Sequence, residues 1–85
     1  MNMKQDKHGN TYYFNSDGQL HRDGDLPAVE YVGGKGFLKK REWWKNGWPH
    51  RDNDLPAVEY ADGTWECWKN GEQYFPIQEH EKIIY

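Results

Sequence analysis

The stretch GQLHRDGDLPAVEY at residues 18–31 recurs as GWPHRDNDLPAVEY at residues 47–60, and eleven of the fourteen positions are identical. The two copies are 29 residues apart, measured from His21 to His50. A long string that occurs twice at a fixed spacing is typical of units that stack on one another and share a core. The sequence therefore predicts a repeat architecture.

A second pair of segments repeats with a shorter offset of 24 residues, EWWKNG at residues 42–47 and ECWKNG at residues 66–71. The difference of five residues is an insertion in the first copy, after Tyr31. A partial copy at residues 12–18 precedes the repeat, and a third copy decays at Tyr74, where the other copies have His. Atypical terminal copies are expected at the ends of a repeat array.

Turn dipeptides divide each copy into short runs of β-forming residues. Asp-Gly or Asn-Gly pairs favour two-residue β-turns, because their residues adopt positive φ, and they occur at residues 17–18, 46–47, 62–63 and 70–71. The runs between them predict strands at residues 11–15, 28–32, 37–45, 57–60 and 64–69. We therefore expect an all-β fold, an antiparallel meander of repeated β-hairpins, with Trp44 and Trp68 in equivalent places.

The segments between the hairpins are expected to be loops. Pro27 and Pro56 lack an amide donor and cannot continue a central strand. Leu26 and Leu55, which precede them, are expected to turn inward. We interpret residues 1–85 as one domain, with a repeat region at about residues 9–75 and a tail at residues 76–85. The tail has the spacing of a short helix, with its apolar residues Ile77 and Ile84 on one face.

Composition restricts the classes of function. Eleven Lys/Arg against 14 Asp/Glu give a net charge of -3, which provides no general positive field for nucleic acid or an anionic membrane surface. No segment is apolar enough to cross a membrane, so no membrane partner is expected. Cys67 has no second cysteine to pair with, and the first residues lack the apolar stretch of a secretory signal. A cytoplasmic location is therefore expected.

The repeated unit Asn-Gly-x-x-His-Arg-Asp-x-Asp-Leu-Pro-Ala-Val-Glu-Tyr, with Glu-Trp-Trp-Lys-Asn-Gly, resembles the MORN-like repeat of bacteriophage, giant-virus and bacterial proteins. The resemblance covers roughly residues 9–74. It implies an array of β-hairpins that serves as an interaction scaffold. It also implies a small phage or viral protein that binds and inhibits a host protein, such as a component of a defence system, which makes the chain an anti-CRISPR candidate in the host cytoplasm.

The His-Arg-Asp triplets are the most conspicuous polar groups in the repeat. They match the start of a protein-kinase catalytic loop, but the required Asn is replaced by Ala28 and Ala57, and the chain is too short for a kinase. Their spacing fits no compact zinc motif. A catalytic residue needed once would not recur in each unit, so we expect no enzyme, cofactor or metal site. A structural role in the repeat is predicted for His21, Arg22, Asp23, His50, Arg51 and Asp52.

The segment that the copies do not share is the best candidate for function. Cations and apolar side chains alternate there, a composition that suits anchors inside a charged rim of a protein interface. The predicted partner-binding residues are Lys35, Phe37, Leu38, Lys39, Lys40, Arg41 and Trp48. The alternative is a nucleic-acid-binding module that uses the basic and aromatic residues of segment 35–48, although the net acidity makes nucleic acid an unlikely partner.

The edges of an open sheet raise the question of self-association. Unpaired amides and carbonyls at two edges, together with surplus aromatic side chains, favour a homodimer. The competing interpretation is that residues 77–85 fold back and cover the exposed face. Cys67 stands where the other copy has Trp43, and we interpret it as a small residue in a partly buried position.

Overall fold

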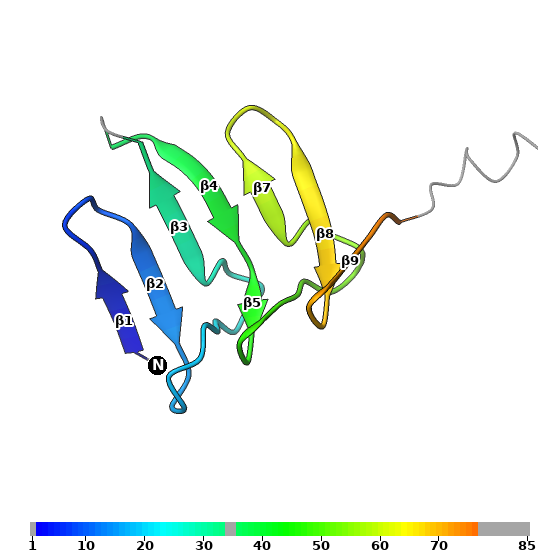
Figure 1. Cartoon of the computed structure of the whole chain (residues 1–85), viewed down its shortest axis with the longest axis horizontal. Helices are drawn as coiled ribbons and strands as arrows, with labels where there is room; N and C mark the ends of the chain where they lie inside the picture. Colours follow the sequence, from blue (N-terminus) through cyan, green and yellow to red (C-terminus); the bar gives the residue numbers. More distant parts are fainter. Residues whose placement is uncertain (1, 34–35, 77–85) are drawn as a thin grey trace, which may run out of the picture.

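The computed structural model describes residues 2–33 and 36–76, and every element in them is a β-strand. Seven strands form one antiparallel sheet in the order β1-β2-β3-β4-β7-β8-β9, and β5 and β6 form a separate small hairpin (Figure 1). The strand bounds are β1 (Asn2–Gln5), β2 (Thr11–Phe14), β3 (Val29–Val32), β4 (Leu38–Glu42), β5 (Trp44–Lys45), β6 (Trp48–Pro49), β7 (Val58–Tyr60), β8 (Trp65–Lys69) and β9 (Glu72–Tyr74). The predicted all-β antiparallel meander is confirmed. The helix predicted for the tail lies outside the described residues.

One structural unit repeats three times along the sheet. Each unit is a hairpin of a first and a second strand, namely β1–β2, β3–β4 and β7–β8. Each second strand leads into a smaller hairpin at the lower edge of Figure 1, formed by the bridge Phe14–Leu20, by β5–β6 and by the end of β8 with β9. Neighbouring units join where β2 pairs with β3 and where β4 pairs with β7.

The turn dipeptides fall into two types. Asn46-Gly47 and Asn70-Gly71 have positive φ at both residues, as two-residue hairpin turns require. Asp17-Gly18 and Asp62-Gly63 have positive φ at glycine alone. Their loops have three residues, because the strands are closed by backbone bonds from Asn15 N–H to Gln19 O and from Tyr60 N–H to Thr64 O. The prediction of two-residue turns was therefore wrong for both Asp-Gly pairs.

The core is small and comes from the same positions of successive units. Its buried apolar residues are Ala28, Val29, Trp43, Ala57, Val58 and Cys67. The inward orientation predicted for Leu26 and Leu55 is wrong, since both are exposed. The inside of each loop holds an arginine instead: Arg22 donates to Pro27 O and Arg51 donates to Pro56 O, at 3.2 and 3.1 Å. The described residues include no helix that would act as a membrane span.

Candidate functional site

The two histidines of the triplets connect each unit to the next small hairpin. His21 Nδ1 accepts the backbone N–H of Asn46 at 3.0 Å, so the ring proton lies on Nε2, which donates to Asp23 at 2.8 Å. The second copy has the same pair of contacts, from Asn70 to His50 and from His50 to Asp52. Both ring nitrogens of both histidines are therefore occupied by structural hydrogen bonds.

The arginines of the triplets stack on an aromatic residue that precedes them in the same unit of the sequence, in β2 for Arg22 and between β4 and β5 for Arg51. The guanidinium carbon of Arg22 lies 3.8 Å from the centre of the Tyr13 ring, and that of Arg51 lies 3.8 Å from the Trp43 ring. Arg51 also makes a two-pronged ion pair with Asp25 of the preceding loop, at 2.9 and 3.3 Å. Its guanidinium thereby connects two units through stacking and charge.

In the third copy, a tyrosine hydroxyl makes the contact to the loop aspartate that this arginine makes in the second copy. Tyr74 OH donates to Asp54 Oδ1 at 3.0 Å, and Asp54 is the counterpart of Asp25. Burial, followed by this hydrogen bond, raises the pKa of Tyr74 to about 12. Cys67 takes the place of Trp43 and lies 3.8 Å from Asp54 O, and burial raises the pKa of its thiol. A buried thiol of this kind is a poor nucleophile.

In the part of the chain that the structure describes, the acidic and histidine side chains form no metal centre. Among residues 2–33 and 36–76, no three His, Cys, Asp or Glu side chains are arranged to hold a metal ion. His50 and Asp52 belong to one loop, where the hydrogen bond from His50, together with Lys45, lowers the pKa of Asp52. The carboxylate is therefore already neutralised by neighbours of its own unit.

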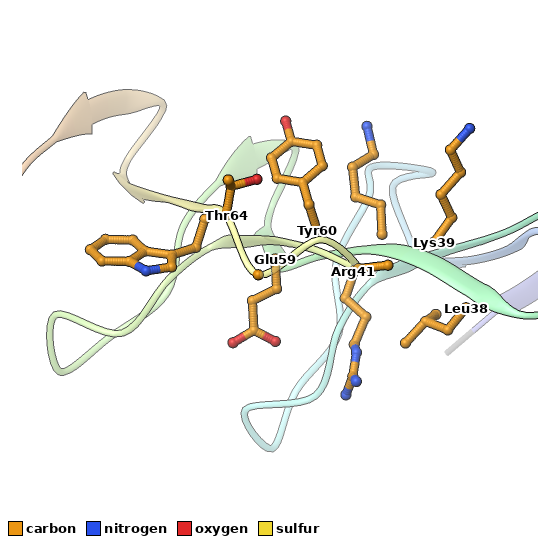
Figure 2. Close-up of a pocket in the computed structure, with 10 residues that line it drawn as sticks. Leu38, Lys39, Arg41, Glu59, Tyr60 and Thr64 are labelled. Carbon is orange, nitrogen blue, oxygen red and sulfur yellow. The ribbon is translucent and has the colours of Figure 1, made fainter.

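The cations predicted to form one basic cluster are divided among different places. Lys40 lies 4.6 Å from the Tyr31 ring and 5.7 Å from the Tyr60 ring, and its Nζ pairs with Glu42 at 3.1 Å. Arg41 points to the opposite side of the sheet (Figure 2). Lys45, at the far end of the segment, pairs with Asp52 at 3.3 Å, and Lys35 lies outside the described residues.

The predicted apolar anchors are also separated. Phe37 and Leu38 lie where β4 begins, and Trp48 lies in the small hairpin beyond the other end of β4 (Figure 1). At about 3.3 Å per residue, a strand from 38 to 45 spans roughly 23 Å. Phe37 is 75% exposed and Trp48 is 60% exposed. The structure thus brings Phe37 and Leu38 together and places Trp48 elsewhere, against the Gly71 turn.

A hollow of about 360 Å³ lies where β4 meets the β7–β8 hairpin (Figure 2). Its residues reach both sides of the sheet, with Tyr60 and Thr64 on one side. The opposite side carries a row in which Arg41 faces Glu59 and Glu59 faces Trp65 on adjacent strands. Leu38 points to the same side (Figure 2), and we name Leu38, Arg41, Glu59 and Trp65 the Trp65 face.

Two residues of the Trp65 face were missed from the sequence. Trp65 is 48% exposed and occupies the position that Arg41 has in the preceding unit, because Trp65 faces Glu59 as Arg41 faces Glu30. A comparison between copies reveals this exchange of a cation for an indole. Glu59 was assigned to the repeat, and its side chain accepts from Arg51 at 3.4 Å while remaining on the Trp65 face.

Comparisons with known proteins add no relative. No protein-family model matches the chain, and neither a curated protein nor a solved structure is similar enough to match.

Proposed function

We propose that the chain is a small non-enzymatic protein-binding module whose contact surface is the Trp65 face. The observation that carries the proposal is the row of half-exposed Trp65 and Leu38 beside Arg41 and Glu59. Tryptophan and arginine, which flank Glu59 in this row, are residue types enriched in interface hot spots. The row lies on paired strands, which hold its side chains in place before a partner arrives.

The repeat loops act as the framework of this module. The ring nitrogens of His21 and His50 and the guanidinium of Arg51 are taken up by contacts within the chain. Groups with such fixed partners have little capacity to bind a substrate or to transfer protons. This use of the triplets supports binding rather than catalysis.

The specific form that we propose is a phage or viral protein that binds and inhibits a host protein, such as a component of a defence system. Its support is the resemblance of the His-Arg-Asp-x-Asp-Leu-Pro-Ala-Val-Glu-Tyr unit to MORN-like repeats. The site of action in this form is the host cytoplasm. A nucleic-acid partner is disfavoured, since Lys40 and Lys45 already pair with Glu42 and Asp52. Lys40 also lies beside the Tyr60 ring, whereas Arg41 points to the side of the sheet opposite to Tyr60 (Figure 2).

The test is affinity capture from a nuclease-treated bacterial lysate, with the wild type compared against matched variants. We expect a host protein whose capture is lost in the Leu38→Ala/Trp65→Ala double variant, because the variant removes both apolar anchors. Phe75→Ala, which removes an even more exposed ring outside the Trp65 face, is the control and retains the protein. Capture that survives in the double variant, or that depends on intact nucleic acid, would contradict the proposal.

A further inference from the structure

The two ends of the repeat array have edges of different kinds. Inside the sheet, units join by pairing a second strand with the first strand of the next unit, β2 with β3 and β4 with β7. At one end of the array, β1 is a first strand and, among residues 2–33 and 36–76, it pairs with β2 alone. At the other end, β8 is a second strand, and β9 pairs with it only from Cys67 onward. Within the described residues, Trp65 and Glu66 have no partner on the side away from β7.

The small hairpin does not block this edge. In the second unit, β4 and β5 follow one another along the chain, and β7 pairs with β4 while β6 pairs with β5. The small hairpin and the next unit therefore fit beside the same stretch of chain. β9 has the register of β6, because Trp68 faces Gln73 as Trp44 faces Pro49. As far as the described residues are concerned, an incoming first strand therefore has the same room beside β8 that β7 has beside β4.

The register of the sheet defines what would meet at such a junction. One row of facing residues crosses all three units, and its members in order are Lys4, Tyr12, Val29, Glu42, Val58 and Glu66. The row begins with a cation on β1 and ends with a carboxylate on β8. If another unit followed in the same register, Glu66 would face Lys4 of that unit. Opposite charges at directly facing positions stabilise strand pairing, whereas like charges oppose it.

We propose that this protein associates head to tail, with β8 of one copy pairing with β1 of the next and Glu66 facing Lys4 across the junction. The proposal does not depend on the proposed function. The junction continues the rule by which the chain joins its own units, so it needs no new geometry. It is a heterologous contact that does not close on itself, and it produces short linear assemblies rather than a twofold dimer. Because the internal junctions contain only two or three facing pairs, the association is weak and sensitive to salt.

The test uses charge exchange in the full chain, followed by sedimentation velocity over a wide range of concentration. Lys4→Glu and Glu66→Lys each place like charges at the junction, and each is expected to weaken association by about tenfold. An equimolar mixture of the two variants restores association, since each junction between different variants again has one Glu and one Lys. Lys7→Glu makes the same change of charge in the β1–β2 turn, outside the row, and leaves association unchanged.

Glu66 also accepts hydrogen bonds from Tyr60 and Trp68, so Glu66→Lys is checked by its thermal unfolding. Glu66→Gln keeps an acceptor oxygen, and it is expected to retain the fold while losing part of the association. Three results overturn the proposal. The first is a full chain that stays monomeric at all concentrations. The same conclusion applies if the full chain is monomeric and only a chain without residues 77–85 associates. The second is association that responds to Lys4→Glu but to neither Glu66 variant, which indicates a β1–β1 dimer. The third is a mixture that fails to restore association.

Discussion

Single arginine side chains carry much of the contact between units. Arg51 stacks on Trp43, pairs with Asp25, donates to Pro56 O and lies 3.4 Å from Glu59. Its side chain is only 14% exposed, so these contacts are shielded from water. Arg22 makes the same stacking and carbonyl contacts, with Tyr13 and Pro27, but has no carboxylate partner among its described contacts.

Comparing Arg51 with Arg22 tests what the carboxylate partners contribute to the free energy of unfolding. We expect Arg51→Ala to lower the free energy of unfolding by roughly 2–3 kcal/mol, since it leaves Asp25 unpaired and removes the stacking on Trp43. Arg22→Ala is expected to cost about 1 kcal/mol. Urea denaturation followed by tryptophan fluorescence measures both. Equal losses for the two variants would show that the contacts to Asp25 and Glu59 add nothing.

Tyr74 gives the chain a dependence on alkaline pH. Its pKa is raised to about 12 in the folded state, and an unfolded tyrosine titrates near pH 10. A raised folded pKa means that the contribution of Tyr74 is complete below pH 10 and is lost as the pH rises toward 12.

The matched variant is Tyr74→Phe, which lacks the hydroxyl that donates to Asp54. We expect the wild type to be more stable than this variant at pH 8, and we expect the difference to shrink between about pH 10 and pH 12. Urea denaturation over this range measures it. Because other tyrosines titrate in both proteins, only the difference is diagnostic, and a difference that stays constant with pH would contradict the assignment.

The small hairpins are the elements that hold successive units in register. Trp48 of β6 packs on the turn that joins β8 to β9, and a Cβ at Gly71 would overlap its ring. In the same element, the backbone N–H of Gly71 donates to Pro49 O at 3.0 Å. The hairpin of one unit thus rests on the hairpin before it, which explains why Trp48 belongs to the framework as well as to the surface.

The variants Gly71→Ala and Gly18→Ala distinguish the loss of stability caused by overlap with Trp48 from the loss caused by backbone strain. Both glycines have similar positive φ, 82° and 77°, so both variants cost about 1 kcal/mol from the left-handed backbone alone. Gly18 has nothing within 4 Å of an added Cβ, whereas Gly71 meets the ring of Trp48. We expect an additional loss of about 1–2 kcal/mol in Gly71→Ala, measured as a lower thermal midpoint. Adding Trp48→Ala should remove the excess, and an excess that persists would place the strain elsewhere.

At the scale of the whole molecule, the sequence was a good guide to the sheet. The repeat and the turn dipeptides predicted the central hairpins, because the same pairs of strands recur at the same offsets. Strand β1 was not predicted, since Asn2–Gln5 lacks β-branched residues and is defined by its pairing with β2. The equivalence of Trp44 and Trp68 is confirmed, with Nε1 of each donating to the preceding glutamate at 2.9 Å.

The candidate site was harder to predict, because a surface depends on which strands become neighbours. Segment 35–48 is continuous in sequence, yet it extends along β4 and into the next hairpin, so Phe37 and Trp48 do not share a surface. Trp65 joins Arg41 only through the strand that lies between them, β7. Cross-strand neighbours of this kind cannot be derived from spacing along one segment.

The most direct test of the central claim is hydrogen–deuterium exchange of the chain with and without a host protein captured from lysate. We expect new protection at the start of β4, in β7 and at the start of β8, around Leu38, Glu59 and Trp65. The loops that hold His21 and His50 should keep their exchange rates, because their polar groups already have partners within the chain. Protection centred on those loops, with none on the Trp65 face, would contradict the assignment of framework and contact surface.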